Sequence, residues 1–273
     1  MNIGFEIFKA QNRILGYMLP DRTAKKAADL FLTPRKHPLK PWESTKEAEG
    51  KRILLDGGLS AIAWGNAKRQ ILLVHGWESR ATQLAGFVDS LVALGFKVIA
   101  LDAPAHGQSA GKQSNPVQFA EAVMQINQQL GPFDGIVGHS MGGSAVGLAL
   151  SQGVECGKVV LISSPSSIIS VLKRFAHFIG LPGKCAQRFI QQVELNVGRP
   201  ANELNIAERL SALKSKGLII HDKGDMEVPF RDAESLSRTW KNASLLATEG
   251  YGHRAIVRQP LVWDKVTEFL AHS

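Results

Sequence analysis

From residue 51 onward, short apolar runs alternate with stretches in which apolar residues recur every three or four positions. Continuous apolar runs are typical of strands buried on both faces, as in parallel sheets, whereas the three-to-four spacing is typical of helices. We predict strands at 52–55, 59–64, 71–74, 97–101, 135–137, 159–162, 218–220 and 244–247, and helices near 80–94, 116–130, 141–152, 230–240 and 260–271. The pattern therefore predicts an α/β protein with a mostly parallel sheet of about eight strands and helices on both faces.

The first two predicted strands depart from the parallel order. They are joined by the turn Asp56-Gly57-Gly58, which is too short for a crossover connection. Strands joined this tightly must run antiparallel, so we predict a β-hairpin at the start of the sheet.

The first fifty residues form a separate N-terminal segment (1–50) in this interpretation. Helical spacing predicts helices at 5–19 and 22–32, with a break at Pro20, and three further prolines make 33–50 an extended linker. The helices either dock on the domain or lie on a membrane surface as amphipathic helices, and docking is favoured. The candidate buried positions are Phe5, Phe8, Leu15, Leu30 and Phe31.

A long interval separates the strands at 159–162 and 218–220. It holds about fifty residues, far more than a strand-to-helix connection needs. Its apolar spacing predicts two or more helices, divided by Gly180-Leu181-Pro182-Gly183. We therefore predict a helical insertion at 167–216 within a core formed by 51–166 and 217–273.

The stretch Gly138-His139-Ser140-Met141-Gly142-Gly143 lies between a predicted strand and a predicted helix. A serine in a Gly-x-Ser-x-Gly turn with this context is the nucleophile-elbow pattern, in which the glycines allow close approach of the backbone. Here the sequence resembles the α/β-hydrolase fold family. The resemblance implies that Ser140 is a catalytic nucleophile and that the insertion at 167–216 is a helical cap.

A serine nucleophile needs a base within hydrogen-bond reach and a third group that orients the base. The family's chain order is nucleophile, acid, histidine. Asp225, which precedes Val228-Pro229, resembles the family's acid, with Asp222 and Glu227 as rivals, and His253 in Gly250-Tyr251-Gly252-His253 resembles its histidine.

Acyl transfer also needs N–H donors for the oxyanion of the tetrahedral intermediate. The resemblance implies that the backbone N–H groups of Met141, which follows the nucleophile, and of Trp77, in His75-Gly76-Trp77, supply them. The segment from Asp102 to Ser109 resembles a structural loop that borders the site in this family.

Composition narrows the class of protein. The net charge of +8 combines a surplus of five positive charges in each of 1–52 and 167–216 with an excess of two negative charges in the remainder. Without a basic run that carries aromatic residues, this surplus does not indicate nucleic-acid binding. Two cysteines and the absence of an apolar run of about 20 residues favour a cytoplasmic protein. No cofactor or metal-ligand pattern is present, and the oligomeric state stays open.

These observations favour a serine hydrolase that cleaves a carboxylic ester of a small or medium acyl group. The alternative enzyme is a thioesterase or acyltransferase, whose acyl-coenzyme A or carrier-protein substrates suit a basic cap. An alternative of another class is a ligand-binding protein that keeps the fold without catalysis. In the favoured interpretation the partner is a small-molecule ester or thioester, and peripheral membrane contact is possible but not favoured.

Overall fold

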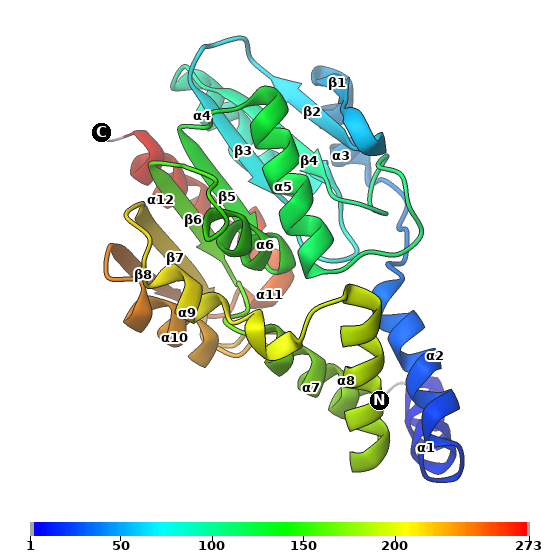
Figure 1. The fold of residues 1–273 in the computed structure, drawn as a ribbon. Helices are drawn as coiled ribbons and strands as arrows, with labels where there is room; N and C mark the ends of the chain where they lie inside the picture. The colour runs from blue at the N-terminus through cyan, green and yellow to red at the C-terminus, as the bar shows by residue number, and fades with distance from the viewer. Residues whose placement is uncertain (1–2, 272–273) are drawn as a thin grey trace. The chain divides into compact units, whose positions relative to one another are not determined.

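An eight-stranded sheet dominates the computed structural model, which describes residues 3–271 (Figure 1). Its order is β1-β2-β4-β3-β5-β6-β7-β8. β2 runs antiparallel to β1 and β4, and the other pairs are parallel. The predicted fold class and hairpin are therefore confirmed. The strands are β1 (Lys51–Leu54), β2 (Ser60–Trp64), β3 (Gln70–Val74), β4 (Lys97–Asp102), β5 (Gly135–His139), β6 (Lys158–Ile162), β7 (Lys216–Asp222) and β8 (Ala243–Thr248).

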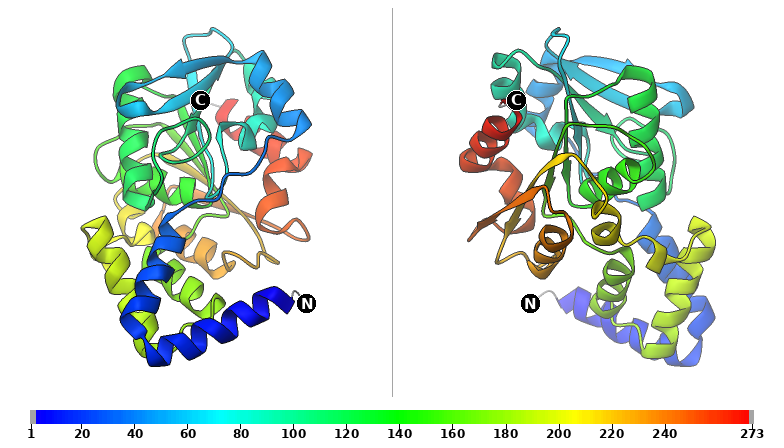
Figure 2. Two further views of the ribbon diagram at one scale, coloured as in Figure 1. Left: turned by 90° about the vertical axis from the view of Figure 1, so that its right-hand side faces the viewer. Right: turned by 60° about the vertical axis from the view of Figure 1, so that its left-hand side comes forward.

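Helices cover both faces of this sheet. Figure 2 (right) shows α12 on one side of the sheet and α5 on the other. The helices that accompany the sheet are α3 (Pro41–Glu49), α4 (Val88–Ala93), α5 (Pro116–Leu130), α6 (Met141–Leu150), α9 (Ile206–Leu210), α10 (Arg231–Thr239), α11 (Gly252–Ala255) and α12 (Pro260–Ala271), with 3-10 turns η1 (Asp56–Gly58), η2 (Ala81–Phe87) and η4 (Ile256–Arg258).

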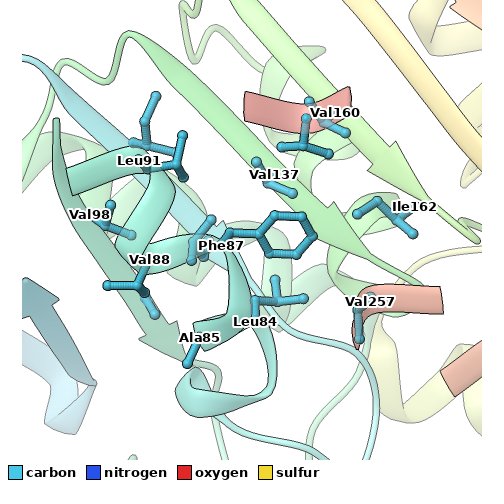
Figure 3. Packing of buried hydrophobic residues seen from close by; sticks show 14 of the residues in the cluster. Leu84, Ala85, Phe87, Val88, Leu91, Val98, Val137, Val160, Ile162 and Val257 are labelled. Carbon is cyan, nitrogen blue, oxygen red and sulfur yellow. The ribbon is translucent and has the colours of Figure 1, made fainter. Parts of the chain in front are cut away.

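One core lies between the sheet and the helices η2, α4 and α12. Figure 3 shows Phe87 of η2 against Val137 of β5 and Ile162 of β6, and all three are fully buried. Burial of a side chain of this size contributes about 1.5–3 kcal/mol. The core therefore holds β5 and β6 in fixed register, and the residues that follow these strands inherit that position.

The chain divides into two compact units. The sheet unit consists of Arg35–Ser166 and residues from Ile206 onward, and the helical unit consists of residues 3–34 and Ser167–Asn205. The helical unit holds α1 (Ile3–Met18), α2 (Pro20–Leu32), α7 (Ile168–Phe178), α8 (Gly183–Val197) and the 3-10 turn η3 (Ala201–Glu203).

Aromatic rings and small residues hold the helical unit together. The ring of Phe31 on α2 lies 5.0 Å from that of Phe175 on α7 and 5.9 Å from that of Phe189 on α8. A Cβ atom at Gly16 of α1 would lie 2.5 Å from Pro182 Cδ, so only glycine allows this approach. The two N-terminal helices and the two insertion helices therefore form one packed body.

This grouping differs from the predicted division into 1–50, a core, and 167–216. Residues from 35 onward belong to the sheet unit, as does α9 at the end of the predicted insertion. The predicted linker is extended only over 34–40, because Pro41–Glu49 is helical. Pro41 occupies the first turn of α3, where proline is tolerated, and Glu43 accepts a hydrogen bond from the Lys40 N–H at 3.0 Å.

Two of the predicted buried positions are also wrong. Leu15 is 43% exposed and Leu30 is 47% exposed, whereas Phe5, Phe8 and Phe31 are partly buried. Leu30 is exposed because the face of α2 that packs in the helical unit consists mostly of small residues. The buried residues of α2 are Thr23, Ala24, Ala27, Ala28 and Leu32. The break at Pro20 is confirmed, since α1 ends at Met18 and α2 begins at Pro20.

Candidate active site

Ser140 lies at the sharp turn from β5 into α6. Its backbone has φ 52° and ψ −122°, a conformation that is unfavourable for a residue with a Cβ atom and that the surrounding packing must stabilise. A Cβ atom at Gly142 would lie 2.4 Å from the carbonyl oxygens of Val74 and His75, and one at Gly138 would lie 2.6 Å from Gly143 Cα. The glycines of the predicted elbow are therefore required by close contact with β3 and with α6 itself.

Three of the predicted site residues form one chain of hydrogen bonds. His253 Nε2 lies 2.9 Å from Ser140 Oγ, and His253 Nδ1 lies 2.8 Å from Asp225 Oδ2. A carboxylate only accepts hydrogen bonds, so Nδ1 carries the proton and Nε2 is left to accept the Ser140 hydroxyl. In this arrangement His253 is positioned to take a proton from Ser140.

The carboxylate of Asp225 is fixed on both oxygens. Oδ1 accepts hydrogen bonds from the N–H groups of Glu227 at 2.9 Å and Val228 at 2.8 Å, while Oδ2 faces His253. Burial alone would raise the pKa of Asp225, but hydrogen bonds from His221, His253 and the Val228 N–H outweigh it and hold the pKa well below its usual range. Asp225 therefore stays ionised and orients the imidazole.

The two rival carboxylates make other contacts. Asp222 accepts hydrogen bonds from Thr248 Oγ1 at 2.9 Å and from the Tyr251 and Gly224 N–H groups at 3.0 Å. It thus holds the loop that carries His253 without contacting the ring. Glu227 pairs with Arg254 at 2.8 Å and lies 4.0 Å from His253 Nε2, the nitrogen that faces Ser140.

The two residues that were predicted to supply oxyanion donors are Met141, which follows the nucleophile, and Trp77, which follows a turn close to it. Met141 is the first residue of α6, where a backbone N–H has no acceptor within the helix. The turn before Trp77 approaches the elbow closely, since a Cβ atom at Gly76 would lie 3.1 Å from Ser140 Cβ. The Trp77 indole packs edge-on against the His106 ring, with centroids 5.0 Å apart.

His139 makes a contact that the sequence did not reveal. Its Nε2 lies 2.9 Å from the backbone carbonyl of His253, so the residue before the nucleophile anchors the loop of the base. Burial lowers the pKa of His139 to about 3, so the ring is neutral and donates from Nε2. Two hydrogen bonds therefore link the elbow to the histidine loop: one from the His139 side chain to the His253 carbonyl, and one between the Ser140 hydroxyl and the His253 ring.

Buried neutral histidines surround the site. Burial lowers the pKa of His106 to about 4 and holds that of His75 well below its usual range. Each ring has both nitrogens occupied, since His75 lies against the Gly76 carbonyl and the Ala103 N–H, and His106 against the Pro104 carbonyl and the Glu78 N–H.

We expect the free energy of unfolding to fall as the pH drops from about 6.5, the ordinary histidine pKa, towards 4. Over this window the unfolded chain protonates His75, His106 and His139 while the folded chain does not, so protons favour the unfolded state. Each such histidine contributes about 1.4 kcal/mol per pH unit. Urea unfolding at pH steps down to about 4.5 measures the slope above the ordinary carboxyl pKa values of about 3.9 for Asp and about 4.3 for Glu.

His106→Asn is the comparison variant for this slope. Its stability at neutral pH is lower. Its unfolding takes up as much as one proton fewer over this pH window, because one buried imidazole is gone, so its stability depends less steeply on pH. A stability that stays level between pH 6.5 and 4.5 in the wild type would contradict neutral burial of these rings.

Over residues 3–271, no three His, Cys, Asp or Glu side chains are grouped so that they could hold a metal ion. No helix in the same range has the length and apolar character needed to cross a bilayer.

Comparison with known proteins identifies the family of this chain. Residues 65–249 match the family described as serine aminopeptidase, S33 (Hydrolase_4). The esterase Rv0045c of Mycobacterium tuberculosis is 30% identical over 118 residues, which are 41% of this chain and 39% of that protein. The chain thus matches well under two thirds of the length of this relative.

Solved structures share the fold at low identity. An esterase of Pyrococcus furiosus, Pf2001, has a TM-score of 0.63 and 20% identity, with 88% of this chain and 96% of that chain covered. A bromoperoxidase of Bacillus anthracis has a TM-score of 0.61 and 18% identity, with 82% of this chain and 100% of that chain covered. These similarities concern the fold.

Proposed function

The chain belongs to the serine aminopeptidase S33 family of α/β-hydrolases, and on that premise we propose that it is a serine hydrolase that cleaves a carboxylic ester of a small or medium acyl group. The observation that carries the proposal is the hydrogen-bond chain from Asp225 through His253 to Ser140. The similarity to the esterase Rv0045c supports ester hydrolysis as the type of reaction.

The first half of the proposed reaction forms an acyl-enzyme. Ser140 Oγ attacks the ester carbonyl carbon while His253 Nε2 takes the hydroxyl proton. The tetrahedral intermediate then breaks its bond to the alcohol oxygen, which leaves with the proton from His253. Asp225 remains ionised throughout and stabilises the transient imidazolium, for which its lowered pKa is suited.

The second half releases the acid. A water molecule attacks the acyl-enzyme carbonyl and gives its proton to His253 Nε2, and the proton then returns to Ser140 Oγ as the acid leaves. In both halves the Met141 and Trp77 N–H groups are proposed to bind the oxyanion. Loss of one such donor typically costs about 3–4 kcal/mol of transition-state stabilisation.

A fluorophosphonate probe tests whether Ser140 is activated. We expect stoichiometric labelling of Ser140, found by mass spectrometry of the peptide, and none in Ser140→Ala. Absence of labelling in the folded wild type would favour the non-catalytic ligand-binding alternative over any hydrolase.

A panel of leaving groups tests the bond that is cleaved. It compares p-nitrophenyl esters of graded acyl length, acyl-coenzyme A thioesters and amino-acid p-nitroanilides, the last because of the family's description. We expect the highest kcat/KM for esters of short and medium acyl chains. A higher value for the thioester would support the thioesterase or acyltransferase alternative, and a higher value for the anilide would replace the ester proposal by amide hydrolysis.

The thioester alternative depends on basic side chains of the insertion, which would attract an anionic acyl carrier. One of these, Arg188 on α8, forms a salt bridge with Asp21 on α2 inside the helical unit. Its charge is thereby partly compensated, which weakens the argument for attraction of an anionic acyl carrier.

A further inference from the structure

Helix α1 is apolar on two opposite sides. One side carries Phe5 and Gly16, which pack against Phe178 and Pro182 of the helical unit, with a ring distance of 4.7 Å between the two phenylalanines. The other side carries large apolar residues that are exposed to solvent. Their exposed fractions are 76% for Ile3, 54% for Ile7, 59% for Ile14, 71% for Tyr17 and 72% for Met18.

These five exposed residues lie together on the helix surface. At 3.6 residues per turn, they and Ala10 fall within an arc of about 100° along the whole 16-residue helix. We call Ile3, Ile7, Ile14, Tyr17 and Met18 the outer face of α1. Figure 2 (left) shows α1, in dark blue, along the edge of the helical unit. A continuous apolar stripe of this kind marks an interaction surface, unlike scattered apolar residues.

Cationic side chains border the outer face. On one side Glu6 and then Arg13 follow its edge, with Lys9 beyond them in a 3.5 Å ion pair with Glu6. Beyond the other edge lies a groove of about 300 Å³ between α1 and α2, lined by Leu15, Leu19 and Leu30 with Arg22 and Lys26. A strip of apolar residues between two sets of cations is thus presented by the helical unit.

We propose that α1 lies in the plane of an anionic lipid surface, with its outer face among the acyl chains and the flanking cations at the headgroups. An apolar face bordered by Lys and Arg is the pattern of interfacial helices, and Tyr17 is a residue type enriched at the membrane boundary. The helix docks on its own unit and still presents a complete second face. The proposal does not depend on the proposed reaction at Ser140.

A second copy of the chain is the competing occupant, because residues 3, 7, 10, 14 and 17 also follow a heptad spacing. Two arguments favour lipid. The spacing covers about two heptads, whereas stable coiled coils need at least three or four. The helical unit also carries ten Lys or Arg against five Asp or Glu, so two such units repel each other while an anionic surface attracts them.

Vesicle co-sedimentation of the full chain tests the proposal. We expect binding to phosphatidylcholine vesicles that contain phosphatidylglycerol, weaker binding to phosphatidylcholine alone, and loss of the difference at high salt. The variant Ile3→Gln/Ile7→Gln/Ile14→Gln/Met18→Gln should bind more than about tenfold more weakly, because it loses four apolar side chains whose transfer into the lipid drives binding. Lys9→Gln with Arg13→Gln should lower the affinity for the anionic vesicles by roughly fivefold per cation.

Leu54→Gln with Leu195→Gln is the matched control. Both residues are as exposed as the outer face, at 81% and 77%, but stand outside α1. We expect this control to bind like the wild type. An unchanged melting temperature and unchanged labelling of Ser140 by the fluorophosphonate probe show that the variants are folded.

Two outcomes would overturn the proposal. One is that the wild-type protein fails to bind the anionic vesicles, or binds them no better than the four-residue variant does. The other is a lipid-free dimer, seen by sedimentation velocity, that the four-residue variant converts to a monomer. The second result would assign the outer face to contact between copies of the chain.

Discussion

Ser140→Ala and His253→Ala are each expected to lower kcat for ester hydrolysis by about four to six orders of magnitude, and the double variant by little more. The reason is that Ser140 and His253, whose Oγ and Nε2 atoms lie 2.9 Å apart, act together in the same proposed step. Without the hydroxyl the imidazole has no proton to take, and without the imidazole the hydroxyl is a weak nucleophile. Initial rates on a p-nitrophenyl ester measure all three variants.

Ser144→Ala is the matched control for this series. Ser144 lies one turn further along α6, is also buried from solvent, and donates a hydrogen bond to the Pro165 carbonyl at 3.0 Å. Its loss removes a structural contact, so the rate should change by a few-fold at most. Effects of the two single variants that multiply in the double variant would indicate two independent roles and contradict the proposed acyl-enzyme mechanism.

Much of the sheet could be predicted because its strands are continuous apolar runs bounded by polar or glycine-rich turns. β3, β4 and β6 begin within one residue of the predicted positions. The helix α3 was not predicted, because the three prolines in 33–50 indicate an extended linker. Proline in fact suits the first turn of a helix, and the Glu43 carboxylate that caps α3 also accepts a hydrogen bond from Thr82, which lies far along the chain.

The packing of the helical unit could not be predicted for a related reason. Periodicity shows that a helix has an apolar face but not which segment covers it. In α1 there are two such faces. The covered one contains Gly16, where glycine is required only because Pro182, more than 160 residues later in the chain, packs against it. Leu15 and Leu30 were therefore assigned to the interior although both are exposed.

The candidate site was predicted residue by residue, but its support was not. Ser140 and His253 stand in glycine-containing turns that the sequence displays, and the structure brings them together with Asp225. The hydrogen bond from His139 to the His253 carbonyl joins loops 114 residues apart. That contact requires the folded sheet, in which β5 and β8 are parallel and therefore have their carboxyl ends at the same edge.

Asp225→Asn is expected to lower kcat by about four orders of magnitude while the protein stays folded. The amide can keep its oxygen towards the Glu227 and Val228 N–H groups, which leaves its NH₂ group facing His253 Nδ1. That nitrogen must then accept, so the proton moves to Nε2 and points at Ser140. A base in the wrong tautomer cannot take the hydroxyl proton. The initial rate of ester hydrolysis and the rate of fluorophosphonate labelling should both fall.

Asp222→Asn is the matched control, because it makes the same chemical change three residues earlier, at the end of β7. The Asp222 carboxylate accepts from Thr248 Oγ1 and from two backbone N–H groups, and hydrogen bonds to it lower its pKa against the opposing effect of burial. An amide can replace only part of these bonds, at a cost of about 1–3 kcal/mol of stability. We expect a lower melting temperature with kcat reduced only a few-fold. A catalytic loss larger for Asp222→Asn than for Asp225→Asn would move the acid to Asp222 and reject the proposed triad.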